Sequence, residues 1–148
     1  MSSGKTLPFE TTLMVRDHCL CLHVQRAARV LARRFDDALR SFALTNGQFS
    51  LLMSLNRPEP PPMAPVASLL AMDRTTLTAA LKPLERRGLV KITKDPADGR
   101  SRILHLTEDG RQLLARALPA WQKTHKEIEK LVPEIDWDGF RRHLKAMA

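Results

Sequence analysis

Apolar residues in the first third of the chain recur at the spacing of one helix face. They are Cys21, Val24, Ala28, Leu31, Phe35 and Leu39. Intervals of three and four predict an amphipathic helix from about residue 17 to residue 39. Its opposite face carries Arg26, Arg29, Arg33 and Asp36. At about 1.5 Å per residue this helix would be roughly 35 Å long, as long as a small domain is wide, so we expect part of it to pack on a partner. The mixed polar residues 1–15 predict a partly ordered arm.

A second helical run begins after residue 44. Thr45 and Gln48 have the spacing of a capping box, in which the first side chain caps the helix and the second reaches back. We expect this helix to end near Asn56. Residues 58–62 then contain four prolines in five positions, which cannot be helix interior and predict a stiff, extended connector. A protein-interaction motif is the alternative, although a linker is the usual role of so short a tract.

Two short helices follow the connector. Residues 63–71 predict the first, with Pro65 in its first turn. Asp73 is a good N-cap for a second helix over about residues 74–87, which Gly88 ends. Two helices joined by a tight turn, the second one basic, form a helix-turn-helix. Pro83 lies inside the second helix and should kink or loosen it.

The second of these helices has one apolar face and one polar face. Leu77, Ala80, Leu81 and Leu84 share the core side. The other residues include the candidate DNA contacts of this helix, namely Arg74, Thr75, Thr76, Thr78, Lys82 and Arg86. Small residues allow close approach to base edges, threonine can bond a base or a phosphate, and a helix N-terminus favours a phosphate. The alternative is an ordinary amphipathic surface helix, which the neighbouring helix and hairpin disfavour.

The runs 89–93 and 102–106 are β-type and predict a hairpin, or wing, with a turn-rich, charged tip. We expect Arg100 to enter the minor groove, because a long cation on a thin hairpin can reach the most negative potential. Arg102, two residues further on, is also a candidate DNA contact of the wing. Asp98 is counted with the wing residues but cannot favour DNA by its charge, so it should pair with Arg102 or Arg100, or cap the turn. An exposed ion pair would contribute only about 0–1 kcal/mol, so its value would lie in orientation. A simply solvated loop is the alternative.

The last third of the chain predicts a long helix capped by Thr107. Its apolar stripe is close to a heptad seam and comprises Leu114, Leu118, Trp121, His125, Ile128 and Val132. Pro119 should bend this helix. A final segment brings Ile135, Trp137, Phe140, Leu144 and Met147.

The long apolar stripes at the two ends of the chain exceed what a small winged helix can cover. We therefore expect them to pair with the same stripes of a second copy. A two-fold dimer would place two recognition helices about one DNA turn apart, which matches an inverted-repeat site.

Composition agrees with a nucleic-acid partner. The chain has 148 residues, enough for one domain, and a net charge of +8. So basic a chain is favoured beside polyanions, with nucleic acid ahead of an anionic membrane. No apolar run approaches the roughly 20 residues of a membrane span, and the N-terminus lacks a signal-peptide pattern. We expect a cytoplasmic protein with no membrane partner.

Residues 69–114, LLAMDRTTLTAALKPLERRGLVKITKDPADGRSRILHLTEDGRQLL, resemble the MarR (multiple antibiotic resistance regulator) family. With the start of the second helical run, the resemblance covers roughly residues 18 to 132. It implies one domain over residues 1–148, with residues 45–106 as a winged helix-turn-helix. It also implies that residues 1–44 and 107–148 dimerise. The fold would be mainly α with a small β-hairpin.

The same resemblance implies a homodimer that binds operator DNA, often as a repressor. Many members release DNA when a small, often phenolic, ligand binds between the dimerisation and DNA-binding regions. The family's recognition positions correspond to Thr75, Thr76, Thr78 and Lys82, and its wing pair to Asp98 and Arg100. Where many members have arginine, this chain has Gly99, so the tip has one cation fewer.

The effector site and the cysteines are less well defined by the sequence. Family geometry suggests a pocket for a small aromatic or phenolic effector near His18, Cys19, Cys21, Arg26, Phe49 and Met53. Cys19 resembles the peroxide-sensing cysteine of the family's organic hydroperoxide regulators. Those sensors also use tyrosines around the thiol, and this chain has none, so a packed cysteine is the alternative. The Cys19/His23 and His18/Cys21 pairs belong to no larger ligand cluster in the sequence, so we expect no metal or other cofactor.

These features distinguish three classes of function. An enzyme would need a nucleophile–base pair, a metal cluster or a phosphate loop, and the sequence has no such pattern. A winged helix used as a protein-interaction module is disfavoured by the charge of +8 and the cationic wing. The sequence therefore predicts a ligand-responsive, sequence-specific, double-stranded DNA-binding repressor, with a thiol-based redox regulator using Cys19 as the alternative.

Overall fold

The computed structural model describes residue 4 and residues 6–148, and it divides into two compact units, Met1–Arg34 and Phe35–Ala148. The first unit holds α1 (Phe9–His18) and most of α2 (Leu20–Leu39). Residues 9–15, expected to belong to a partly ordered arm, are therefore helical; residues 1–3 and 5 of that arm lie outside the described residues. The single helix expected from residue 17 is also wrong, because Cys19 is extended (φ −67°, ψ 105°) and separates α1 from α2.

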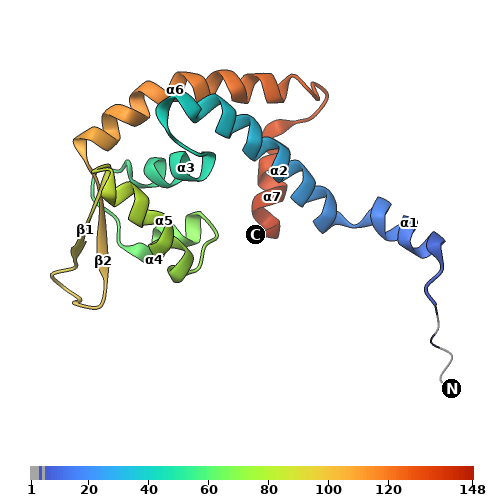
Figure 1. The fold of residues 1–148 in the computed structure, drawn as a ribbon, viewed down its shortest axis with the longest axis horizontal. Helices are drawn as coiled ribbons and strands as arrows, with labels where there is room; N and C mark the ends of the chain where they lie inside the picture. Colours follow the sequence, from blue (N-terminus) through green and yellow to red (C-terminus); the bar gives the residue numbers. More distant parts are fainter. Residues whose placement is uncertain (1–3, 5) are drawn as a thin grey trace. The chain divides into compact units, whose positions relative to one another are not determined.

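The second unit contains the elements that the helix-turn-helix pattern predicts. In chain order they are η1 (Arg40–Phe42), α3 (Asn46–Leu55), α4 (Met63–Leu69), α5 (Arg74–Arg86), β1 (Val90–Lys94), β2 (Arg102–Leu106), α6 (Glu108–Glu129) and α7 (Trp137–Met147). Figure 1 shows α3, α4, α5 and the hairpin gathered at the N-terminal end of α6, with the tip of the hairpin projecting away from the helices.

A leucine-rich core holds these elements together. Its largest fully buried side chains are Leu39, Leu51, Leu52, Val66, Leu77, Leu81, Leu84 and Leu104. The α5 leucines are those predicted for its core side, and each is 0% exposed. Burying a leucine contributes about 1.5–3 kcal/mol, so the core determines which face of α5 points outward.

The start of α3 is held from two directions. The predicted capping box is present, with the Gln48 amide donating to Thr45 Oγ1 and the Thr45 amide donating to Gln48 Oε1, both at 3.1 Å. Asp36 of α2 adds a contact that the sequence did not indicate. Its Oδ1 accepts from the backbone amide and from Nδ2 of Asn46, at 2.7 and 2.9 Å. These bonds hold the pKa of the Asp36 carboxyl below its usual value.

Both ends of α5 have defined caps. The Asp73 carboxylate accepts from the Thr76 amide at 2.7 Å, and this bond lowers the pKa of Asp73. After α5, Gly88 has a left-handed φ of 71°, which explains why the helix stops there. Thr107 then donates its hydroxyl to the Gly88 carbonyl at 2.7 Å and accepts from the Gly110 amide at 3.1 Å. One threonine thus caps α6 and ties it to the end of α5.

The two internal prolines do not end their helices. Helix α5 runs unbroken through Pro83, and α6 runs unbroken through Pro119.

The hairpin has the predicted position, and the proline connector packs on its edge. Strands β1 and β2 pair antiparallel, from Val90 opposite Leu106 to Lys94 opposite Arg102. The Leu104 amide donates to the Pro61 carbonyl at 2.9 Å, and Pro62 forms an isolated bridge with Ile103. Proline suits a sheet edge because it can accept but not donate a hydrogen bond. The connector therefore braces β2 at its middle and toward the tip of the wing, as well as linking α3 to α4.

Gly110 and Gly47 give a matched test of this packing. A Cβ at Gly110 would lie 2.5 Å from the Leu89 carbonyl oxygen, whereas one at Gly47 would meet only Thr45 Oγ1 at 4.0 Å. In the first turn of a helix, glycine to alanine normally stabilises by up to about 1 kcal/mol. We expect Gly47→Ala to follow that rule and Gly110→Ala to destabilise by about 1–3 kcal/mol through overpacking. Urea unfolding measures both, and equal effects would contradict the close approach of α6 to Leu89.

The Asp36 contact predicts a pH-dependent contribution to stability. Because the pKa of Asp36 is lowered in the folded state, its contribution is complete above the unfolded pKa of about 3.9 and is lost as pH falls through the folded value. Asp36→Asn keeps an acceptor but removes this titration. The free energy of unfolding of the wild type should therefore approach that of the variant as pH falls below about 4. Glu59→Gln, at an exposed position of the connector, is the control; a constant difference at all pH values would contradict the assignment.

Candidate nucleic-acid interface

The outward face of α5 presents the residues predicted to contact DNA. Arg74, Thr75, Thr76, Thr78, Lys82 and Arg86 are all exposed. They lie on the helix whose leucine face is buried in the core. The face combines short threonine side chains near the N-terminal end of α5 with Lys82 and Arg86 further along the helix. Such a surface can approach a groove closely and neutralise phosphates on its edge.

Two of the polar groups on this face are already engaged. The Thr78 hydroxyl donates to the Arg74 carbonyl at 2.8 Å, which leaves its oxygen lone pairs and its methyl group for a partner. The Thr76 amide donates to the Asp73 carboxylate at 2.7 Å. That carboxylate occupies one of the amides at the N-terminus of α5, and the phosphate expected there stays a prediction.

The tip of the hairpin is held by bonds within the turn. Asp98 Oδ1 accepts from the Arg100 amide at 3.0 Å, and Asp95 Oδ1 accepts from the Ala97 amide at 2.9 Å. Arg102 donates from Nη1 to the carbonyls of Gly99 and Ser101, both at 3.2 Å. Of the two roles expected for Asp98, the structure shows the turn cap; within the described part of the chain it forms no ion pair.

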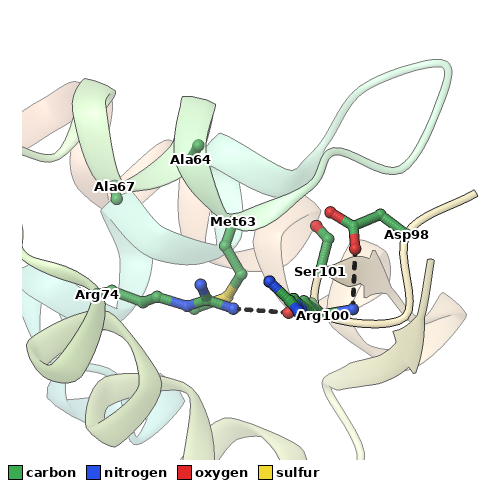
Figure 2. Close-up of a pocket in the computed structure, with 7 residues that line it drawn as sticks. All are labelled: Met63, Ala64, Ala67, Arg74, Asp98, Arg100 and Ser101. Atoms are coloured by element: carbon green, nitrogen blue, oxygen red, sulfur yellow. Dashed lines mark hydrogen bonds between the residues drawn. The ribbon is translucent and has the colours of Figure 1, made fainter.

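Arg74 joins the start of α5 to this tip. Its Nη2 donates to the Arg100 carbonyl at 3.0 Å, across 26 positions of the chain. Figure 2 shows the Arg74 side chain extended toward that carbonyl, next to Met63 at the start of α4. A cavity of about 410 Å³ lies here, lined by Met63, Ala64, Ala67, Arg74, Asp98, Arg100 and Ser101. The contact has no signal in the sequence, because it depends on how the hairpin lies against α5.

A second cavity lies between α3, the end of α4 and α6. It has a volume of about 410 Å³ and is lined by Phe49, Ser50, Met53, Ser54, Leu69, Leu70, Leu118 and Trp121. Phe49 and Met53 were predicted to line an effector pocket. The Phe49 and Trp121 rings stack with centroids 6.1 Å apart. The other predicted pocket residues, His18, Cys19, Cys21 and Arg26, belong to the Met1–Arg34 unit, and their place in a pocket stays a prediction.

Trp121 also contacts a polar network that links α6 to α7. Its ring lies 4.9 Å from the His125 ring, centroid to centroid. His125 Nδ1 is 3.4 Å from Glu129 Oε1. Glu129 forms an ion pair with Arg141 of α7, and the Glu129 carbonyl accepts from Trp137 Nε1 at 3.2 Å. The polar contacts of His125 and Glu129 thus flank Ile128, a buried member of the predicted stripe, and link α6 to α7.

Both cysteines are free thiols. Cys19 precedes α2 instead of lying inside a helix, and its Sγ accepts from the Leu22 amide at 3.4 Å. Cys21 is exposed, and its Sγ accepts from Gln25 Nε2 at 3.2 Å. A redox role for Cys19 stays a prediction.

Among the described residues, no group of three or more His, Cys, Asp or Glu side chains could hold a metal ion. No helix of the described chain has the length and apolar character to cross a membrane.

Two helices in a tight turn, followed by a hairpin on the same core, define the winged helix-turn-helix class of DNA-binding folds. A model of the MarR family matches residues 44–101, from the residue before the α3 cap to the hairpin tip. The repressor NicR of Pseudomonas putida is 31% identical over 112 residues, which cover 76% of this chain and 68% of NicR. The regulator TtmR of Methylorubrum extorquens is 35% identical over 97 residues, 66% of this chain and only half (50%) of TtmR.

A solved structure of a transcriptional regulator is also similar to this chain. The M. tuberculosis transcriptional regulator MosR, in complex with DNA, superposes with a TM-score of 0.77 at 34% identity, over 88% of this chain and 93% of MosR. This chain belongs to the MarR family.

Proposed function

We propose that this protein is a sequence-specific, double-stranded DNA-binding transcription regulator that represses as a homodimer on an inverted-repeat operator. The observation that carries the proposal is the exposed face of α5, with its threonines, Lys82 and Arg86, beside a braced tip that presents Arg100. The chain's charge of +8 supports the same partner. So does the complex of the similar regulator MosR with DNA. Binding to chromosomal DNA also agrees with the expected cytoplasmic location.

Exposed apolar side chains support a second copy as the dimer partner. In α2, Val24, Val30 and Leu31 are 42%, 43% and 37% exposed, and in α7, Phe140 and Met147 are 43% and 60% exposed. These residues lie in the segments predicted to dimerise. Covering them with the same segments of a second copy would remove a large apolar surface from water.

The cavity beside Trp121 supports a small aromatic effector. Its walls are apolar apart from Ser50 and Ser54, and a planar ring could pack against Phe49 and Trp121. Ser54 is buried, and its hydroxyl donates to the Leu51 carbonyl, so its oxygen can still accept from a phenolic hydroxyl. None of the residues lining the cavity carries a positive charge. A neutral phenol therefore suits this lining better than a carboxylate, because the lining offers a carboxylate no ionic partner.

The salt dependence of DNA binding tests the proposed interface. On an operator duplex selected from random sequence, log affinity should fall linearly with log salt concentration. Lys82→Gln should weaken binding and reduce the slope by about 0.9 for each phosphate that is no longer neutralised. Arg100→Ala should also weaken binding. Lys123→Gln makes the same change at an exposed position of α6 and should leave the slope unchanged. Affinity independent of salt would instead favour a protein-interaction module.

Fluorescence tests the effector cavity, because the chain has two tryptophans and only Trp121 lines it. In a Trp137→Phe variant, a neutral phenol should quench Trp121 in a saturable way. The matching benzoate should bind about tenfold more weakly, because the lining offers its charge no ionic partner. The Trp121→Phe variant, which keeps Trp137, is the control and should show no saturable change. Tighter binding of the benzoate than of the phenol would contradict the assignment of a neutral effector.

A further inference from the structure

We propose that Arg74 is a positioning residue that ties the tip of the wing to the start of α5. Its bond would hold the Arg100 side chain at a set distance from the outward face of the recognition helix. This inference rests on the proposed DNA-binding function of that face. It assigns to Arg74 a role different from the direct DNA contact that the sequence suggested.

The geometry places Arg74 where it can act on the tip. Arg74 is the first residue of α5, and its Nη2 lies 3.0 Å from the main-chain oxygen of Arg100. Both residues line the 410 Å³ cavity between α4, α5 and the wing. The Arg74 side chain extends along the wall of this cavity, past Met63, to the tip, as Figure 2 shows. Across the described residues, this is the hydrogen bond that joins α5 to residues 95–101.

The other hydrogen bonds of the tip are local. Asp98 caps the Arg100 amide, and Arg102 donates to the carbonyls of Gly99 and Ser101. These bonds maintain the shape of the turn, but they join the turn only to itself. A two-stranded hairpin is marginally stable by itself. The connector braces β2 at Leu104 and at Ile103, which lies one pair from the tip end of the ladder. Beyond that point, Arg74 restrains the turn itself, residues 95–101, from outside the hairpin.

Arginine is chemically suited to this restraint. Its guanidinium is a rigid planar group that is always charged, and its hydrogen bond to a carbonyl is stronger than one between neutral groups. The acceptor is the carbonyl of Arg100 itself, so the bond acts on the same residue whose side chain is proposed to enter the minor groove. A guanidinium has five N–H donors, which means that geometry alone allows Arg74 to contact a phosphate as well.

DNA binding separates the two roles, because only a direct phosphate contact changes the number of counterions released. If Arg74 positions the wing, Arg74→Gln should weaken binding by about threefold to tenfold, as expected for removing one hydrogen bond, with an unchanged salt slope. It should also add little in an Arg100→Ala background, where the positioned side chain is absent. A fall in slope of about 0.9 per phosphate, like that expected for Lys82→Gln, together with additive effects, would make Arg74 a phosphate contact and overturn the proposal.

Backbone relaxation of the free protein tests the restraint without DNA. In Arg74→Gln, the amides of Gly99, Arg100 and Ser101 should become less rigid, with order parameters falling from about 0.85 toward 0.6. The matched variant Lys82→Gln should leave them unchanged, and unfolding curves of both variants should confirm intact folds, since both positions are exposed. Unchanged order parameters in Arg74→Gln would overturn the proposal. A more mobile tip in a protein that does not bind DNA would instead overturn the proposed function and leave the restraint standing.

Discussion

The burial of one leucine stripe of α5 is the constraint on which the DNA-binding surface depends. Leu77, Leu81 and Leu84 are completely buried, and they lie on one side of a 13-residue helix. Turning the helix by a single residue, about 100°, would remove these side chains from the core and bury threonine or lysine in their place. Each leucine contributes about 1.5–3 kcal/mol, so the helix has one stable orientation. The outward face of α5 is a consequence of that packing.

The connections from α5 to the hairpin and from the hairpin to α6 fix where the wing lies relative to α5. Gly88 ends the helix in a left-handed conformation, and Thr107 joins the Gly88 carbonyl to the first turn of α6. The hairpin therefore begins and ends at two residues, Gly88 and Thr107, that are joined to each other by a hydrogen bond. Close approach of Gly110 to the Leu89 carbonyl and the Leu106 side chain holds the two ends of the hairpin against α6. A change in the position of α6 would therefore move the wing.

Helix α6 also carries the cavity and the contacts to α7. Trp121 forms part of the cavity wall with Phe49, and it contacts His125, where the network with Glu129 and Arg141 begins. A ligand in the cavity would touch α3, the end of α4 and α6. These elements include the first helix of the helix-turn-helix and the helix that supports the wing. If a ligand displaced one of these helices, the neighbouring helices would move with it, because packed side chains have little free volume to absorb a displacement.

The order and type of the elements in the Phe35–Ala148 unit were predictable from local signals in the sequence. Helical spacing, the Thr45 capping box, the Asp73 and Thr107 caps and the β-type runs are set by contacts within a few residues. They sufficed to predict the core face of α5, its exposed polar face and the wing. The same reasoning failed at Cys19, because the apolar stripe that predicted the helix begins only at Cys21 and says nothing of the backbone before it, which is extended at Cys19. Periodicity reports which face is apolar and does not report a single extended residue.

Which distant residues meet depends on the packing of whole elements and could be seen only in the folded chain. Asp36 caps α3 from ten positions away, and Arg74 reaches the wing from 26 positions away. Trp121 stacks on Phe49 although α4, α5 and the hairpin lie between them in the sequence. Charged or aromatic side chains at such positions look like ordinary surface or core residues in the sequence, because nothing within a few residues of them marks the partner. The residues proposed to contact DNA were therefore predictable one by one, whereas the bonds that place them relative to each other were not.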